Sequence, residues 1–89
     1  MASRLATVAS AVGLHARPAT LFVQAAAAAG LPVTVGRPGQ KAVDARSILM
    51  VMSLGVKGGE QVELAAEGEN ADAVLDELAA LLSTDMDAE

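Results

Sequence analysis

The sequence predicts an α+β fold of two layers, in which a four-stranded antiparallel sheet is covered on one face by three helices in the order β-α-β-β-α-β-α. Four short segments are rich in β-branched or alternating apolar residues, and three others have helical composition or spacing, with Gly and Pro between them. The strands carry too few apolar residues to be buried on both faces, so the helices must cover only one. The length of 89 residues suits one domain, residues 1–89, with a single core.

The first strand and helix are separated by a glycine. Residues 3–9 alternate loosely and predict a short strand, and Gly13 breaks the chain after it. Pro18 fits the first turn of a helix, because its missing N–H would have no partner there. Residues 19–29 have strongly helix-forming composition, and Gly30 stops the helix.

A hairpin and a short helix follow. Residues 33–35 are β-branched throughout, residues 37–40 have turn chemistry, and residues 41–43 resume an extended stretch. Ser47 can cap a second helix over residues 48–54, which a glycine closes.

The last two elements are a half-buried strand and an amphipathic helix. Residues 62–66 alternate between apolar and polar positions, which predicts a strand with one buried face. Asn70 is a suitable N-cap for the final helix. Its apolar residues recur at helical spacing: Val74, Leu75, Leu78, Leu81 and Leu82.

Composition excludes several classes of site. The chain has no cysteine and one histidine, which excludes a disulfide framework, an iron–sulfur cluster and a thiolate zinc site, so we expect no metal and no cofactor. Six basic residues and one acid give the first 59 positions a charge of +5, whereas ten acids and no base give the remaining 30 a charge of −10. The first part could therefore hold an anion, while the acidic end would repel nucleic acid and anionic lipid.

A charge-free run over residues 18–36 approaches the length that spans a bilayer. Pro, Thr, Gln and Gly interrupt it, and alanine contributes little to insertion. No short basic start precedes it, as a signal peptide would require. We therefore expect a cytoplasmic protein without membrane insertion.

The only histidine, His15, lies in the segment Gly13-Leu14-His15-Ala16-Arg17-Pro18-Ala19, immediately before a predicted helix. The N–H groups of Ala16 and Arg17 lack helical partners, and the helix dipole and the Arg17 guanidinium favour an anion there. Imidazole is also a nucleophile near neutral pH and can carry a covalent group. Judged on the residues alone, a lone histidine before a helix is more often an exposed or capping residue, and both interpretations remain open.

Two longer strings carry a family resemblance. The sequence GLHARPA at residues 13–19 and SILMVMSLGVKGGE at residues 47–60 resemble the HPr phosphocarrier family of the bacterial phosphoenolpyruvate-dependent sugar phosphotransferase system. The resemblance implies an open-faced β-sandwich. It also implies that Enzyme I phosphorylates His15 on Nδ1, using phosphoenolpyruvate as donor, that Arg17 steadies the phosphate, and that sugar-specific IIA proteins accept the group. In some members a serine kinase phosphorylates the residue that matches Ser47.

The second predicted helix is apolar on nearly every side. Met50 stands where the family commonly has Gly, which bears on the fit of a kinase to the preceding serine. Leu49, Met52 and Ser53 should lie close together on the helix, so that one side is core and the other exposed. The alternative is a fully buried helix. The resemblance implies that an apolar patch here, with Thr20, docks Enzyme I and IIA. The opposite side of the helix holds Ile48, Val51 and Gly55.

Two other functions are weaker hypotheses. Residues 55–58 fit the GxxG of a KH loop, but a single aromatic residue provides no stacking platform and the net charge of −5 lacks a basic footprint, so we expect no nucleic-acid partner. A hydrolase using Ser47, His15 and Asp44 would lack the G-x-S-x-G elbow. We therefore expect a monomeric phosphoryl carrier, not an enzyme that turns over substrate by itself.

Overall fold

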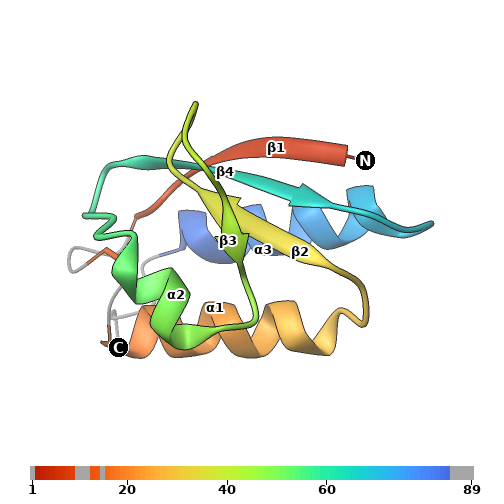
Figure 1. The fold of residues 1–89 in the computed structure, drawn as a ribbon, viewed down its shortest axis with the longest axis horizontal. Coiled ribbons are helices and arrows are strands. Elements are labelled where there is room, and N and C mark those ends of the chain that lie inside the picture. Colours follow the sequence, from red (N-terminus) through yellow and green to blue (C-terminus); the bar gives the residue numbers. More distant parts are fainter. Residues whose placement is uncertain (1, 10–12, 15, 85–89) are drawn as a thin grey trace.

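The computed structural model describes residues 2–9, 13–14 and 16–84, which form four strands and three helices (Figure 1). The elements follow the predicted order, and their bounds are β1 Ala2–Thr7, α1 Ala16–Ala28, β2 Val33–Gly36, β3 Val43–Asp44, α2 Ile48–Ser53, β4 Gln61–Ala66 and α3 Ala71–Ser83.

The strands form one antiparallel sheet in the order β1-β4-β2-β3. The register places Ala6 opposite Val62 and Val35 opposite Leu64, so side chains of alternate residues meet on one face. Helices α1 and α3 lie on that face, and α2 packs against α1 and β3 (Figure 1). The predicted two-layer, open-faced arrangement is confirmed.

The core lies between the sheet and the helices. Phe22 of α1 is fully buried, as are Leu75 and Leu78 of α3 and the inward residues of β4 and β2. Full burial of one such apolar side chain stabilises the fold by about 1.5–3 kcal/mol. Because the chain has one phenylalanine and no tyrosine or tryptophan, the rest of the core is made of aliphatic side chains: Ala6, Val8, Leu14, Ala19, Ala26, Val33, Val35, Ala45, Val51, Val56, Val62, Leu64, Ala66, Ala71, Val74 and Leu82.

Two strand boundaries differ from the sequence prediction. The first strand ends at Thr7; Val8 still exchanges backbone hydrogen bonds with Glu60 and Gly59, and the Ala9 N–H then turns to the carbonyl of Leu82 in α3. The strand expected at residues 41–43 comprises Val43 and Asp44 instead. Its partners in β2 are Thr34, which lies opposite Asp44, and Val35, which lies opposite Val43.

The structure also shows where helices α1 and α3 begin. Helix α1 begins at Ala16, two residues before Pro18, and a proline is tolerated there because first-turn N–H groups have no helical partner. Asn70 is the N-cap of α3 as expected, but its side chain makes no capping hydrogen bond. None of the helices in the described part of the chain has the length and apolar content needed to cross a membrane.

Candidate functional site at the start of α1 and the adjoining α2

The loop that leads into α1 rests directly on the segment after α2. Leu14 is buried, and its N–H donates to the carbonyl of Val56 over 3.0 Å. Gly13 has φ +72°, and a Cβ added to it would lie 2.1 Å from that carbonyl oxygen. Only glycine allows this approach, because any side chain would overlap the facing backbone. The chain therefore enters the candidate site along a fixed path.

The first turn of α1 has the features of an anion site. It contains no acidic residue, and Arg17 and Thr20 are exposed while Pro18 and Ala19 are buried. The N-terminal end of a helix favours negative charge, and Arg17 adds a guanidinium. The structure therefore brings Arg17, Thr20 and the N–H of Ala16 to one end of α1. His15 lies outside the described residues.

Ser47 caps α2. Its backbone is extended, with φ −104° and ψ 113°, and its Oγ accepts a hydrogen bond from the Met50 N–H over 3.4 Å. The expected cap is confirmed. Ser53 donates from Oγ to the Met50 carbonyl over 2.6 Å, at the other end of this short helix.

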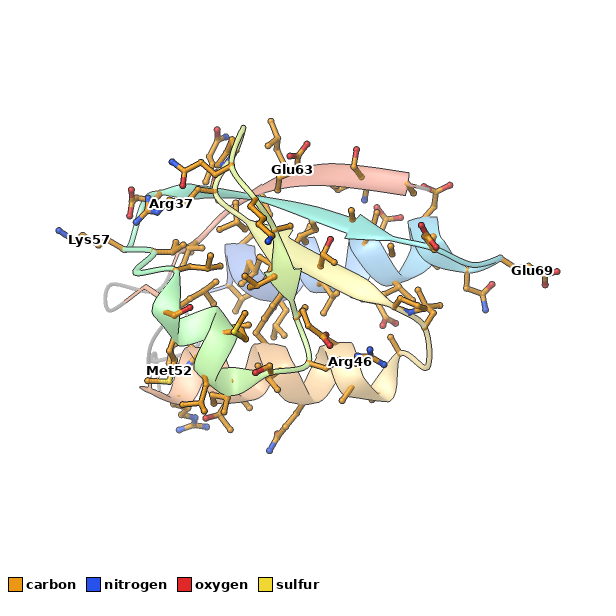
Figure 2. All side chains as sticks on the ribbon, in the orientation of Figure 1. Arg37, Arg46, Met52, Lys57, Glu63 and Glu69 are labelled. Atoms are coloured by element: carbon orange, nitrogen blue, oxygen red, sulfur yellow. The ribbon has the colours of Figure 1, made fainter. Side chains whose placement is uncertain are left out.

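Large apolar side chains of α2 are exposed at the surface. Val51 is fully buried, but Leu49 is 79% exposed and Met50 is 45% exposed, so the alternative of a fully buried helix is wrong. Ser53 is exposed, whereas Met52 is partly buried against the core and lies on the α1 side of α2 in Figure 2. The prediction that one of the two sets is core and the other exposed is therefore wrong, because Ile48 is exposed although Val51, on the same predicted side, is buried.

The reason lies in the length of α2. It has six residues, of which Ile48 is the first, whereas the residue that is buried, Val51, lies within the helix. Ile48 is therefore exposed, and Gly55, expected on the same side as Val51, is exposed after the helix has ended. Together Ile48, Leu49 and Met50 form an exposed apolar group that we call the α2 patch.

Sequence reasoning missed a charged cluster beside this helix. Arg37 donates from Nε to the Leu54 carbonyl (3.2 Å), from Nη2 to the Gly55 carbonyl (2.8 Å) and from Nη1 to Glu60 Oε2 (2.7 Å). Glu60 Oε1 accepts from the Lys57 N–H over 2.7 Å. The hydrogen bond with Arg37 is the main cause that holds the pKa of Glu60 below its ordinary value of 4.5, and it raises the pKa of Arg37. The turn chemistry of residues 37–40 gave no signal for a partner 23 positions away.

The structure does not support the hydrolase or the KH-loop hypothesis. The carboxylate of Asp44 accepts hydrogen bonds from Arg46, at 2.9 Å from its backbone N and 3.2 Å from Nε, which lower the pKa of Asp44. Asp44 is therefore already bound to a cation and does not resemble a triad acid. Residues 55–58 connect α2 to β4 and not two helices, as a KH loop would. In the described ranges, no group of three or more His, Asp or Glu side chains is arranged to hold a metal ion.

Comparison with known proteins identifies the family. The family described as "PTS HPr component phosphorylation site" matches residues 2–84. The chain belongs to the HPr phosphocarrier family of the phosphotransferase system.

Individual relatives agree with this assignment. The phosphocarrier protein HPr of Streptomyces coelicolor is 48% identical over 83 residues, covering 93% of this chain and 89% of the relative. A crystal structure of HPr from Thermoanaerobacter tengcongensis has a TM-score of 0.90 at 37% identity, covering 100% of this chain and 99% of that one. An HPr dimer from the same organism has a TM-score of 0.67 at 45% identity, covering 78% of each chain. The HPr fold that the sequence resemblance implied is therefore confirmed.

Proposed function

We propose that this chain, as a single domain, carries a phosphoryl group on His15 from Enzyme I to sugar-specific IIA proteins. One observation carries the proposal beyond family membership. The turn that follows His15 in sequence is the N-terminal turn of α1, and it combines the positive end of the helix dipole with an exposed Arg17 and no acidic side chain. These are the groups that hold a phosphate, and the neighbouring imidazole is the nucleophile that can carry it.

The proposed relay consists of two phosphoryl transfers, both at His15 Nδ1. The lone pair of His15 Nδ1 forms the N–P bond while the bond from phosphorus to the donor atom of Enzyme I breaks. In the second transfer an acceptor atom of IIA takes the phosphoryl group and Nδ1 regains its lone pair. Arg17 and the N–H groups of Ala16 and Arg17 stabilise charge on the transferred oxygens. An N–P bond is labile enough for both steps, whereas a serine ester would trap the group, so the carrier mainly positions the phosphorus.

The partner surface combines Thr20 on α1 with Leu49, Met52 and Ser53 on α2. Leu49 is the most exposed large apolar side chain among the described residues, and the α2 patch extends the apolar area around it. Contiguous exposed apolar surface rimmed by polar groups is typical of protein docking sites. We place Enzyme I and IIA on this surface, which α1 and α2 share.

Ser47 is the proposed regulatory site for a serine kinase. A phosphate on its Oγ would keep acceptor oxygens at the start of α2 and add negative charge at the edge of the α2 patch. Met50, the residue whose N–H Ser47 caps, is 45% exposed beside it. Modification would therefore weaken docking more than folding. The chain acts as a monomer in the cytoplasm and turns over only with its partners.

Reconstitution of the relay tests the proposal. Wild-type protein is mixed with Enzyme I, labelled phosphoenolpyruvate and a IIA protein, and label is followed on each component. We expect the IIA protein to be labelled only when the carrier is present, and not with His15→Ala, whose circular dichroism should match wild type. Transfer through His15→Ala would contradict the proposal. Light scattering at the working concentration checks the monomeric state.

A further inference from the structure

We propose that Arg37 is a positioning residue for phosphoryl transfer, because with Glu60 it fixes the segment on which the loop before His15 rests. The inference depends on the proposed function, since it concerns the geometry of the same nucleophile. Arg37 itself belongs to the turn between β2 and β3 and contacts no residue of the proposed phosphate site among the contacts described for it.

The first step is the hold of Arg37 on the end of α2. The carbonyls of Leu54 and Gly55 follow the last helical residue, where main-chain acceptors have no partner within the helix. Nε and Nη2 of Arg37 donate to these two carbonyls, and Nη1 donates to Glu60. One planar guanidinium therefore joins the β2–β3 turn, the end of α2 and the approach to β4. Lysine could not reproduce this, because its ammonium is a single point on a flexible stem.

The second step is that Glu60 fixes the other end of residues 55–57. Glu60 accepts from Arg37 at Oε2 and from the Lys57 N–H at Oε1, and its own N–H donates to the Lys57 carbonyl over 3.1 Å. Figure 2 shows Arg37 and Lys57 at the same end of the molecule. Residues 55–57 are thus held at both ends by one ion pair and its backbone bonds.

The third step transmits this position to the loop. Arg37 holds the carbonyls of residues 54 and 55, and the next carbonyl, that of Val56, accepts from the Leu14 N–H. Val56 is 3% exposed, and the backbone of Gly13 lies so close to it that no added carbon would fit. A shift of Val56 must therefore shift Leu14, the residue before His15. Misplacement of a reacting group by 1 Å can cost about 100-fold in rate.

The test compares Arg37→Gln, Arg37→Lys and Glu60→Gln with a matched control. Arg4→Gln is that control, because Arg4 also forms an ion pair with a carboxylate, Asp76, and its side chain is 36% exposed compared with 29% for Arg37. Each variant is titrated into the Enzyme I reaction well below its melting temperature. Hydrogen exchange of the Leu14 amide and of the amides of β4 is measured in parallel.

We expect the maximal rate with Arg37→Gln to fall about 10-fold, less than the loss for a full 1 Å displacement. The KM for the carrier should change less than the maximal rate, because Arg37 bonds to the carbonyls after α2 whereas the α2 patch lies in the first three positions of that helix. Arg37→Lys and Glu60→Gln should show smaller losses, and Arg4→Gln none. Exchange of the Leu14 amide should accelerate in Arg37→Gln while the amides of β4 change less.

Two results would overturn the inference. Wild-type rates in both Arg37→Gln and Glu60→Gln would show that the segment needs no such support. Equal acceleration of exchange at Leu14 and throughout β4, with a normal rate for the folded fraction, would show that Arg37 only stabilises the fold. Failure of wild-type protein to accept phosphate at all would instead contradict the proposed function, so the two failures are distinguishable.

Discussion

Replacing Gly13 by alanine should damage the candidate site more than any other single methyl group added to a glycine of the described chain. The new Cβ would lie 2.1 Å from the Val56 carbonyl oxygen and 2.7 Å from the Cα of Lys57, both of them backbone atoms that cannot rotate away. The backbone is also left-handed at φ +72°, which side chains rarely adopt. The loop or the facing segment must therefore move.

Three contributions set the loss of stability in Gly13→Ala. A non-glycine residue at positive φ costs about 1–3 kcal/mol. Forcing a carbon into a filled space costs about another 1–3 kcal/mol, and loss of the Leu14–Val56 hydrogen bond costs about 1 kcal/mol. Gly30→Ala is the matched control, because Gly30 has φ +77° and nothing lies within 4 Å of its added Cβ. The variants should therefore differ by about 2–4 kcal/mol.

Thermal and urea unfolding measure this difference. At about 4–8 °C per kcal/mol for a domain of this size, Gly13→Ala should melt at least about 8 °C below Gly30→Ala. At a temperature where both are folded, Gly13→Ala should also accept phosphate more slowly, because its loop is displaced. Equal melting temperatures and equal transfer rates for the two variants would refute the close approach and its role.

Three further predictions concern charge. Ser47→Asp keeps an acceptor at the N-cap, so its melting temperature should stay near wild type, while the KM for the carrier in the Enzyme I reaction rises because a carboxylate at the patch edge must be partly desolvated on docking. Unchanged kinetics would contradict this. Arg17→Ala should slow transfer by about 10- to 1000-fold in quenched-flow measurements, with Arg46→Ala as a control for loss of an exposed cation, and an unchanged rate would exclude a phosphate-steadying role. Glu60 has a lowered pKa, so its stabilisation is complete above the ordinary value of 4.5 and is lost as the pH falls through the lower folded value. Urea unfolding of Glu60→Gln should therefore show a shallower loss of stability than wild type below about pH 4.5, and parallel curves would contradict the pairing with Arg37.

Local patterns were sufficient to predict the elements but not their contacts. The alanine-rich stretch after Pro18 and the leucine spacing of α3 predict helices because helical composition and period are local properties. The Ser47 cap followed for the same reason, since its acceptor and donor are three residues apart. Strand order, by contrast, depends on pairing between distant segments, and no sequence pattern placed β4 between β1 and β2.

In the candidate site, too, local motifs were predicted from the sequence and contacts between distant segments were not. His15, Arg17 and Ser47 were predicted from continuous motifs, whereas the hold of Arg37 on α2 joins residues that only the folded chain brings together. Ile48 and Val51 were grouped on one side by helical spacing, but in a six-residue helix only Val51 is buried. Burial at a helix end is set by tertiary packing, which the period of a helix does not encode.

The central claim is that His15 Nδ1 carries the phosphoryl group. Because His15 is the only histidine of the sequence, 15N-histidine labelling gives a single imidazole whose two nitrogens can be followed by NMR. The protein is phosphorylated with Enzyme I and phosphoenolpyruvate, and coupling between 31P and each ring nitrogen is measured. The account predicts coupling to Nδ1 alone, lost together with the phosphate after mild acid. A phosphorus signal that couples to neither nitrogen of His15 and survives acid would contradict it.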